Sequence, residues 1–282
     1  GLMRMLEEGL DHPEDLLEIP EIQVSWEDRD MLDARDREMI RALGLRFRGR
    51  MAWPQFRSYR AGFVPWHLEP EEVSLLGHAL DQLLVLLPRL RSAPDLLDGA
   101  SVRSCPLRRA AHRGDELAWT DGTLDLSAWI ARGGEPHPDV AGAGGLVDGK
   151  ELGRLRRLER LAVPIEVDLF VVPASIDQRD GHRPRQAYML VAMDCHRGLV
   201  LHQQGLEAVP SWEAMHGMAV GWFVELCTML QCVPREVRLR RPLLAEALHP
   251  LAVELGVDLL LVDALPAVSC VRAELYEMMG MD

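Results

Sequence analysis

Residues 188–202 read Tyr-Met-Leu-Val-Ala-Met-Asp-Cys-His-Arg-Gly-Leu-Val-Leu-His, and they carry the clearest structural signal in the chain. The apolar run Tyr188–Met193 has the length of a strand, and the short polar connection Asp194–Arg197 leads into a second apolar run at Gly198–His202. Two apolar runs with so short a connection predict a pair of antiparallel strands.

Strand and helix patterns alternate on both sides of this pair. Upstream, the apolar segment Ile165–Val172 predicts another strand, which makes three strands in succession. Downstream, the pattern predicts helices at Trp212–Cys232, Leu243–Leu255 and Val268–Met279, with strands between them at Glu236–Arg240 and Asp258–Val262. The order is β-β-β-α-β-α-β-α. Because strand–helix–strand units favour parallel pairing, we expect an α/β (mixed α+β) fold whose C-terminal part is a mixed β-sheet with flanking helices.

The N-terminal half gives a weaker pattern of short elements. We expect a strand at Glu21–Trp26, a helix at Asp33–Leu43, a strand and an ordered loop within Leu45–Leu68, a helix at Glu69–Leu90, a hairpin of Glu116–Thr120 and Thr123–Trp129 with Asp121-Gly122 as its turn, and a helix at Glu151–Leu161. Residues 132–150 hold six glycines and two prolines without periodicity, which is typical of a linker or loop. The predicted division is an α+β domain at 1–131, a flexible linker at 132–150 and an α/β domain at 151–282.

The chain of 282 residues is 48% hydrophobic and 27% charged, a composition typical of a soluble globular protein. Its formal net charge of −13 argues against a protein that binds nucleic acid over its whole surface. The most apolar segment, 214–233, is interrupted by charge and is better explained as a buried helix, so we expect no membrane association. Thirty arginines stand beside one lysine and no asparagine, which indicates a GC-rich genome and a bacterial source.

The five cysteines, at positions 105, 195, 227, 232 and 270, form no CxxC pair. An odd count without paired spacing argues against a disulfide framework and against a structural zinc site. With no signal-peptide pattern in the sequence, we expect reduced thiols and a cytoplasmic location. A glycine-rich stretch precedes Lys150, but Glu151 stands where a phosphate-binding loop needs Ser or Thr, so neither a nucleotide nor any other cofactor is predicted.

The segment 53–66 reads Trp-Pro-Gln-Phe-Arg-Ser-Tyr-Arg-Ala-Gly-Phe-Val-Pro-Trp, in a chain with only 5% aromatic residues. One hypothesis is a ligand site, because aromatic rings stack on flat ligands and arginines bind carboxylate or phosphate. Its residues would be Trp53, Arg57, Tyr59, Arg60 and Trp66, beside a basic patch at Arg46, Arg48 and Arg50. The alternative, which we favour, is a rigid loop whose aromatic rings are used in packing.

The string WPxFRSYxxGxxPW at 53–66, together with the C-terminal pattern from residue 188 onward, resembles an uncharacterised bacterial family of domains of unknown function. This resemblance covers about residues 45–90 and most of the C-terminal half, and it implies no activity. The order β-β-β-α-β-α-β-α also resembles the ribonuclease-H-like fold of nucleases and integrases. The resemblance to that fold implies acidic residues on the first strand, at the end of the fourth strand and on the last helix, where they hold two divalent metals.

Under this second resemblance the candidate metal ligands are few. They are Asp168 or Glu166 on the first strand, Asp194 in an alternative register, and Glu274 or Glu277 on the last helix. The position at the end of the fourth strand falls within Arg238-Leu-Arg-Arg-Pro242, where a cation would repel a metal. We therefore expect no metal and no catalytic residue. An ion pair of Arg240 or Arg241 at this place would exclude the metal centre, whereas three converging carboxylates would support it.

Two functions follow as hypotheses. The first is a non-enzymatic binding or scaffold protein that holds a protein partner or a small anionic ligand at the 53–66 segment or between the two domains. The second is a metal-dependent, nuclease-like phosphodiester hydrolase with a degenerate or displaced acidic centre. The sequence favours the first, leaves the question of an enzyme open, and gives no oligomeric state.

Overall fold

The computed structural model describes residues 17–94, 104–114, 116–125, 127, 147–176 and 182–280. These residues form two compact units. The first unit takes its described residues from Glu21–Ser58 and His67–Glu135, and the second unit takes them from Asp11–Pro20, Tyr59–Trp66 and Pro136–Asp282. The protein mixes helices and strands in several sheets, which confirms the predicted α/β or α+β class.

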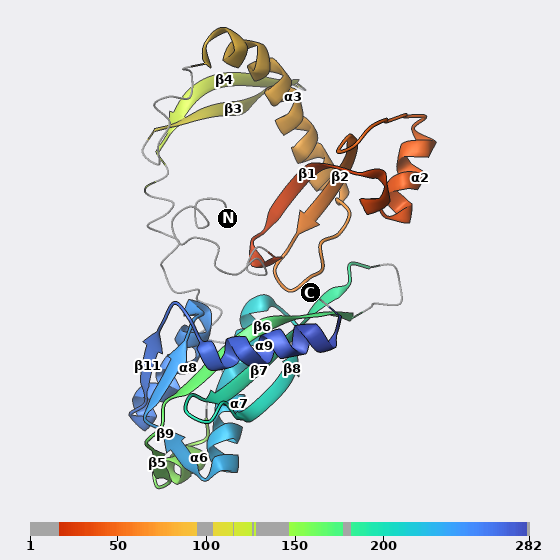
Figure 1. Ribbon diagram of the computed structural model, residues 1–282. Helices are drawn as coiled ribbons and strands as arrows, with labels where there is room; N and C mark the ends of the chain where they lie inside the picture. The colour runs from red at the N-terminus through yellow and green to blue at the C-terminus, as the bar shows by residue number, and fades with distance from the viewer. Residues whose placement is uncertain are drawn as a thin grey trace. The chain divides into compact units, whose positions relative to one another are not determined.

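The second unit is built on one five-stranded mixed sheet (Figure 1). Its strands are β6 (Ile165–Ile176), β7 (Arg185–Asp194), β8 (Val200–Leu206), β10 (Glu236–Leu239) and β11 (Asp258–Leu261). They lie in the order β11-β10-β6-β7-β8, which is 5-4-1-2-3 when the five strands are counted along the chain. β7 is antiparallel to β6 and β8, whereas β10 is parallel to β6 and β11.

Helices cover both faces of this sheet (Figure 1). α7 (Trp212–Leu230) and α8 (Pro242–Leu255) lie on one face, and their side chains form the main apolar core with the sheet. α9 (Pro266–Met278) lies on the other face over a smaller apolar cluster. The strongly apolar segment 214–233 is therefore mostly a buried helix, as the sequence predicts.

The alternation of side chains along β6 decides which of its residues face which helices. Ile165 and Val167 belong to the main core beneath α7 and α8. Phe170 packs in the cluster beneath α9. Glu166 and Asp168 therefore lie on the α9 face, although both are almost fully buried, at 3% and 2% exposed. Buried carboxylates need partners, and Asp168 or Glu166 is the first-strand acid that the resemblance to the ribonuclease-H-like fold implies as a metal ligand.

The ends of the helices use the local signals found in the sequence. The Ser211 side chain accepts a hydrogen bond from the Ala214 amide at 3.1 Å and begins α7. Gly256 ends α8 with a φ of +62°, a left-handed conformation that costs glycine little. These caps explain why both boundaries could be predicted.

The predicted helix Glu151–Leu161 is wrong in its second half. α6 (Gly149–Leu155) ends earlier, and a short strand β5 (Glu159–Leu161) follows it. β5 is parallel to another short strand, β9 (Cys232–Pro234). The Arg160 side chain also donates a hydrogen bond to the last carbonyl of α8. Tertiary pairing therefore overrides the helical pattern of this segment.

The first unit consists of small elements around one long helix. They are β1 (Glu21–Glu27), a 3-10 turn η2 (Arg29–Met31), α2 (Ala34–Ala42), β2 (Trp53–Tyr59), α3 (Pro70–Ser92), β3 (Cys105–Arg113) and β4 (Glu116–Leu124). β1 pairs with β2, and β3 pairs with β4. Leu32 and Ile40 are the only buried apolar side chains among its described residues. The first unit therefore has a very small apolar core.

The predicted turn at Asp121-Gly122 is wrong. In the antiparallel pair of β3 and β4, Asp121 lies within β4 directly opposite Arg108. The chain reverses at Gly114 instead, which has a φ of +63°. Asp121 forms ion pairs with both Arg108 and Arg89, at 2.7 and 3.0 Å. Asp121 therefore serves as the partner of Arg108 across the two strands, and it does not form a turn.

α3 differs from the other long helices in its exposure. It has 23 residues, and none of their side chains is buried. Among the residues that the structure describes, it is the one helix with the length and apolar composition to cross a membrane, with a mean hydropathy of 1.3 over its most apolar part.

The division into units departs from a simple cut at the predicted linker. Residues 132–146 of that linker lie outside the described part of the chain, and α6 already begins at Gly149. The first unit includes residues up to Ser58, whereas residues 59–66 belong to the second unit. The chain thus passes from one unit to the other within the segment 53–66.

Candidate functional site

The buried acid Asp168 on β6 has two arginine partners. Its Oδ2 lies 3.7 Å from Nε of Arg240, and its Oδ1 lies 3.5 Å from Nε of Arg241. Both arginines directly follow β10, the fourth strand of the sheet in chain order. Arg241 is itself only 7% exposed and forms a second ion pair with Glu18. The cation expected from the sequence is therefore present beside the acid.

The neighbouring acid Glu166 also has internal partners. Its Oε2 accepts a hydrogen bond from the Val268 amide at 3.0 Å, in the first turn of α9. Its Oε1 lies 3.8 Å from Sγ of Cys195, the donor of a weak hydrogen bond. Burial raises the pKa of the Cys195 thiol to about 11, so this thiol is not a reactive thiolate. Glu166 thus serves the positive end of a helix, which is a structural use of a buried carboxylate.

Asp194 ends β7 and organises the turn that follows. Its Oδ1 accepts hydrogen bonds from the amides of His196 and Arg197 at 2.8 and 2.9 Å. The hydrogen bond from Arg197 is the main reason that the pKa of Asp194 lies below its usual value. Glu274 is exposed on α9. Asp168, Asp194 and Glu274 do not form a three-ligand cluster in the described part of the chain.

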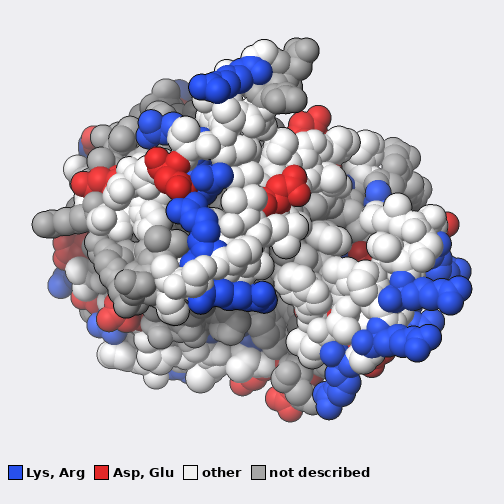
Figure 2. All heavy atoms as spheres, turned by 90° about the horizontal axis from the view of Figure 1, so that it is seen from above, with Lys and Arg blue, Asp and Glu red and all other residues white. Residues whose placement is uncertain are grey.

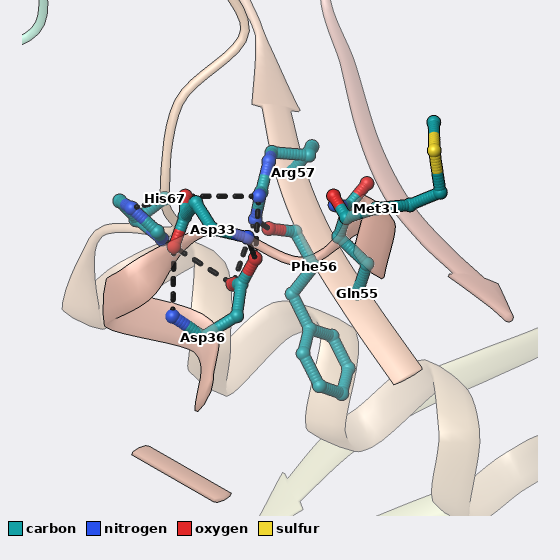
Figure 3. Close-up of polar contacts among 7 residues, drawn as sticks. All are labelled: Met31, Asp33, Asp36, Gln55, Phe56, Arg57 and His67. Atoms are coloured by element: carbon teal, nitrogen blue, oxygen red, sulfur yellow. Dashed lines mark hydrogen bonds and ion pairs between the residues drawn. The ribbon is translucent and has the colours of Figure 1, made fainter. Parts of the chain in front are cut away.

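A second polar cluster lies in the first unit around Arg57, one of the candidate ligand residues of the 53–66 segment (Figure 3). Arg57 of β2 donates to both carboxylate oxygens of Asp36 at 2.9 and 2.6 Å, and to Oδ2 of Asp33 at 3.1 Å. His67, which precedes α3, places Nε2 3.2 Å from Asp33 and Nδ1 3.7 Å from Asp36. Four side chains from three segments therefore meet at the N-terminus of α2.

Local sequence explains why the two aspartates of this cluster lie together. Asp33 is the N-cap of α2 and accepts a hydrogen bond from the Asp36 amide at 2.8 Å. The Asp36 side chain accepts one from the Asp33 amide at 3.2 Å, which completes a capping box. The two acids three residues apart at a helix start were the signal that could have indicated this cluster.

The surroundings of the cluster shift the pKa values of two of its side chains. Burial by itself would raise the pKa of Asp36, but the hydrogen bonds and positive charge of Arg57 lower it below its usual value. Burial, together with Arg35 and Arg57, lowers the pKa of His67, although Asp33 opposes this effect. At neutral pH His67 is therefore a neutral imidazole, and the Arg57 guanidinium is the cation that pairs with Asp36.

This composition decides what the cluster can do chemically. Asp33, Asp36 and His67 each offer one ligand atom, and these atoms lie within 4.8 Å of one another, as in a metal site. The Arg57 guanidinium already binds the Asp36 carboxylate with two hydrogen bonds. A cation would have to displace that arginine, so the cluster fits a structural ion-pair network better than a metal centre.

The predicted ligand residues of the 53–66 segment are divided between the two units. Trp53 and Arg57 belong to the first unit, whereas Tyr59, Arg60 and Trp66 belong to the second. The Trp53 ring packs edge-on against Phe47 with 5.8 Å between ring centroids, and the Arg29 guanidinium lies 5.7 Å from its centroid. Trp53 and Arg57 are therefore used in internal contacts.

The clearest exposed feature near this segment is basic. Residues 39–68 contain six arginines and no acidic residue, in a chain with a net charge of −13. Arg41, Arg46, Arg48 and Arg50 are all exposed, and one of them, Arg50, forms an ion pair with Asp28 at 3.7 Å. Figure 2 shows basic side chains gathered along the right-hand edge of its view, on the side where α2 lies in Figure 1.

Apolar side chains are exposed between these arginines. Leu43, Leu45 and Met51 are 66%, 49% and 60% exposed. We call residues 41–51 the arginine–leucine segment. Exposed arginines interleaved with apolar side chains are typical of a surface that meets a partner.

Comparisons with known protein families match the chain in two separate stretches. Residues 1–108 match the model of a domain of unknown function (DUF7309), and residues 151–276 match that of another domain of unknown function (DUF6930). A search of curated proteins found no match. The chain is therefore similar, in its N-terminal and C-terminal parts respectively, to two families whose function is unknown.

Proposed function

We propose that the protein is a non-enzymatic binding protein that recognises an acidic protein partner through the arginine–leucine segment of its first unit. The single observation that carries this proposal is the acid-free stretch 39–68 with its four exposed arginines. A carboxylate-rich partner would attract these arginines electrostatically, while Leu43, Leu45 and Met51 would add apolar contacts. The arginine-rich, lysine-poor composition supports a bacterial source. The five cysteines without a CxxC pair support a cytoplasmic location for this interaction.

The second unit would then serve as a scaffold. Its strand order and strand directions support a ribonuclease-H-like arrangement, in which Asp168 stands on the first strand. Two divalent metals would need free carboxylates at that place. Arg240 and Arg241 compensate the charge of Asp168 instead, which supports a framework without hydrolytic chemistry. Fold by itself does not imply the activity of other proteins that share it.

The test uses a fluorescent poly-glutamate peptide as a probe of acidic partners. The full chain should bind this peptide with an affinity that falls as salt is raised, because the contacts are electrostatic. The triple variant R46E/R48E/R50E should bind at least about tenfold more weakly, since each lost charge contact is worth about 0.5 kcal/mol or more. Fluorescence anisotropy measures both affinities.

The matched control is R154E/R197E/R235E, which changes three exposed arginines of the second unit and alters the net charge by the same amount. Equal weakening by both triple variants would contradict the proposal, because net charge alone would then explain the binding.

A second experiment tests the alternative function, by incubating the protein with an oligonucleotide and Mn²⁺. Cleavage that Asp168→Asn abolishes would establish the hydrolase in place of the binding protein.

A further inference from the structure

The N-terminal part of the chain has the opposite charge to the arginine–leucine segment. Residues 5–16 read Met-Leu-Glu-Glu-Gly-Leu-Asp-His-Pro-Glu-Asp-Leu, with five acidic side chains and no arginine or lysine. We call them the acidic segment, and they lie outside the described part of the chain. The arginine–leucine segment, residues 41–51, has four arginines and no acidic side chain. Two stretches of opposite charge in one chain attract each other electrostatically.

Apolar side chains stand between the charges in both segments. The arginine–leucine segment exposes Leu43, Leu45 and Met51, at 66%, 49% and 60%. The acidic segment has four apolar side chains between its acids, which are Met5, Leu6, Leu10 and Leu16. A contact between the two would pair charge with charge and would cover apolar surface on both. The acidic segment therefore matches the arginine–leucine segment in both kinds of contact.

The described structure already contains one contact of this kind. Asp28 forms an ion pair with Arg50 at 3.7 Å, and it accepts a hydrogen bond from the Met51 amide at 2.7 Å. Asp28 belongs to the acidic stretch 5–30, which holds ten acidic residues and one arginine. One carboxylate of this stretch therefore lies against the arginine–leucine segment in the described part of the chain.

The acidic segment is long enough to reach the same surface. The strand β1 (Glu21–Glu27) covers about 23 Å and ends directly before Asp28. The sixteen residues 1–16 can extend over as much as about 50 Å. Because both segments belong to one chain, the effective concentration of the acidic segment at this surface is on the order of 1 mM. An acidic partner would have to compete with it.

We propose that the acidic segment occupies the arginine–leucine segment of the same chain when no partner is bound. Its carboxylates pair with Arg46, Arg48 and Arg50, and an acidic partner binds by displacing them. The role of the segment as a competitor rests on the proposed function, whereas the contact between the two segments does not depend on it. A partner must bind more tightly than the chain's own segment, so weakly acidic proteins are excluded.

Crosslinking tests the contact directly in the full chain. A carbodiimide joins a carboxylate to a lysine amine where the two touch, and Lys150 is the one lysine of the sequence. The variant R48K adds a lysine at the proposed contact and keeps the positive charge. Mass spectrometry of the monomer should find this lysine joined to acids of residues 5–16. The control R113K changes an exposed arginine of β3 in the same unit and should give no such crosslink.

Removal of the acids tests the competition. The variant E7Q/E8Q/D11N/E14Q/D15N should abolish the crosslink of R48K. It should also bind the poly-glutamate peptide about tenfold more tightly than the unmodified chain, because the competing segment is lost. The control E159Q/E225Q/E254Q/E274Q/E277Q removes five exposed acids of the second unit and changes the net charge equally, so its affinity should rise much less. Fluorescence anisotropy measures all three affinities.

Three results would overturn this inference. The first is an R48K variant that crosslinks to residues 5–16 no more than R113K does. The second is a crosslink found only in a species of twice the mass, which would identify a second copy as the source of the acidic segment. The third is an equal gain in affinity for both quintuple variants, because net charge alone would then explain it.

Failure of the proposed function is a separate outcome. In that case the crosslink of R48K would form and would depend on the five acids, but R46E/R48E/R50E would bind the poly-glutamate peptide as well as the unmodified chain does. The contact between the two segments would then stand, and the arginine–leucine segment would not be the site of an acidic partner.

Discussion

His216 shows how one side chain couples the stability of the second unit to pH. It is 1% exposed within α7, and its Nδ1 lies 3.0 Å from the Trp212 carbonyl, to which it donates. Burial is the main cause that lowers the pKa of His216 to about 4, from an ordinary value of 6.5. The folded protein therefore keeps this imidazole neutral where the unfolded chain would protonate it.

The sign of the effect follows from that difference. Between about pH 6.5 and 4 the unfolded chain binds a proton at position 216 and the folded chain does not, so stability falls as the pH falls. The loss approaches about 3 kcal/mol at pH 4. His216→Gln keeps a donor for the Trp212 carbonyl and should flatten this part of the profile, measured by urea unfolding at a series of pH values. Equal slopes for the two proteins would contradict the assignment.

Gly62 is a position where no other residue fits. Its φ is +84°, and a Cβ added there would lie 2.4 Å from Cβ of Ala208. Gly62→Ala should therefore lower the free energy of unfolding by about 2 kcal/mol or more, from strain and overlap together. Gly221→Ala is the matched control, because nothing lies within 4 Å of its added Cβ in α7. That change should stabilise the helix by about 0.5–1 kcal/mol. Thermal unfolding of the two variants gives opposite shifts if both arguments hold.

At the scale of elements, the contact between Asp168 of β6 and the two arginines after β10 holds the centre of the sheet to the start of α8. Asp168→Asn keeps the shape but removes the negative charge that faces Arg240 and Arg241, and Arg241 is left with its ion pair to Glu18. We expect a loss of about 3 kcal/mol in the free energy of unfolding. Glu254→Gln, which removes an exposed ion pair with Arg156, should cost about 0.5 kcal/mol or less. Chemical denaturation compares the two, and a harmless Asp168→Asn would show that the pair contributes nothing.

Elements were predictable where a cap or an apolar period lay within the element itself. Ser211 caps the start of α7, and Gly256 caps the end of α8. Both caps depend on residues next to the helix, so these two boundaries could be predicted from the sequence. The hairpin of β3 and β4 could not be predicted correctly, because the partner of Asp121 is Arg108 on the other strand. The strand β5 was not predicted for the same reason, because its partner β9 lies about 70 residues away along the chain.

At the scale of the whole molecule, the two units differ sharply in how much apolar surface they bury. Leu32 and Ile40 are buried in the first unit, and all other buried apolar side chains of the described residues lie in the second. The first unit should therefore open at a lower free energy than the second. Hydrogen exchange followed by mass spectrometry should show faster exchange in β1 and β2 than in β6 and β7. Equal protection would mean that the first unit is covered by something outside its described residues.

The sequence by itself determined the alternation of strands and helices in the C-terminal half, the helix caps, and the cation near the expected acid position. These depend on residues that are neighbours along the chain. Only the tertiary structure decided that Arg240 and Arg241 reach Asp168, that Arg57 joins Asp33, Asp36 and His67, and that 53–66 is shared between two units. Each of these is a contact between segments far apart in the sequence, and the energy of such a contact depends on distances and burial that local patterns do not contain.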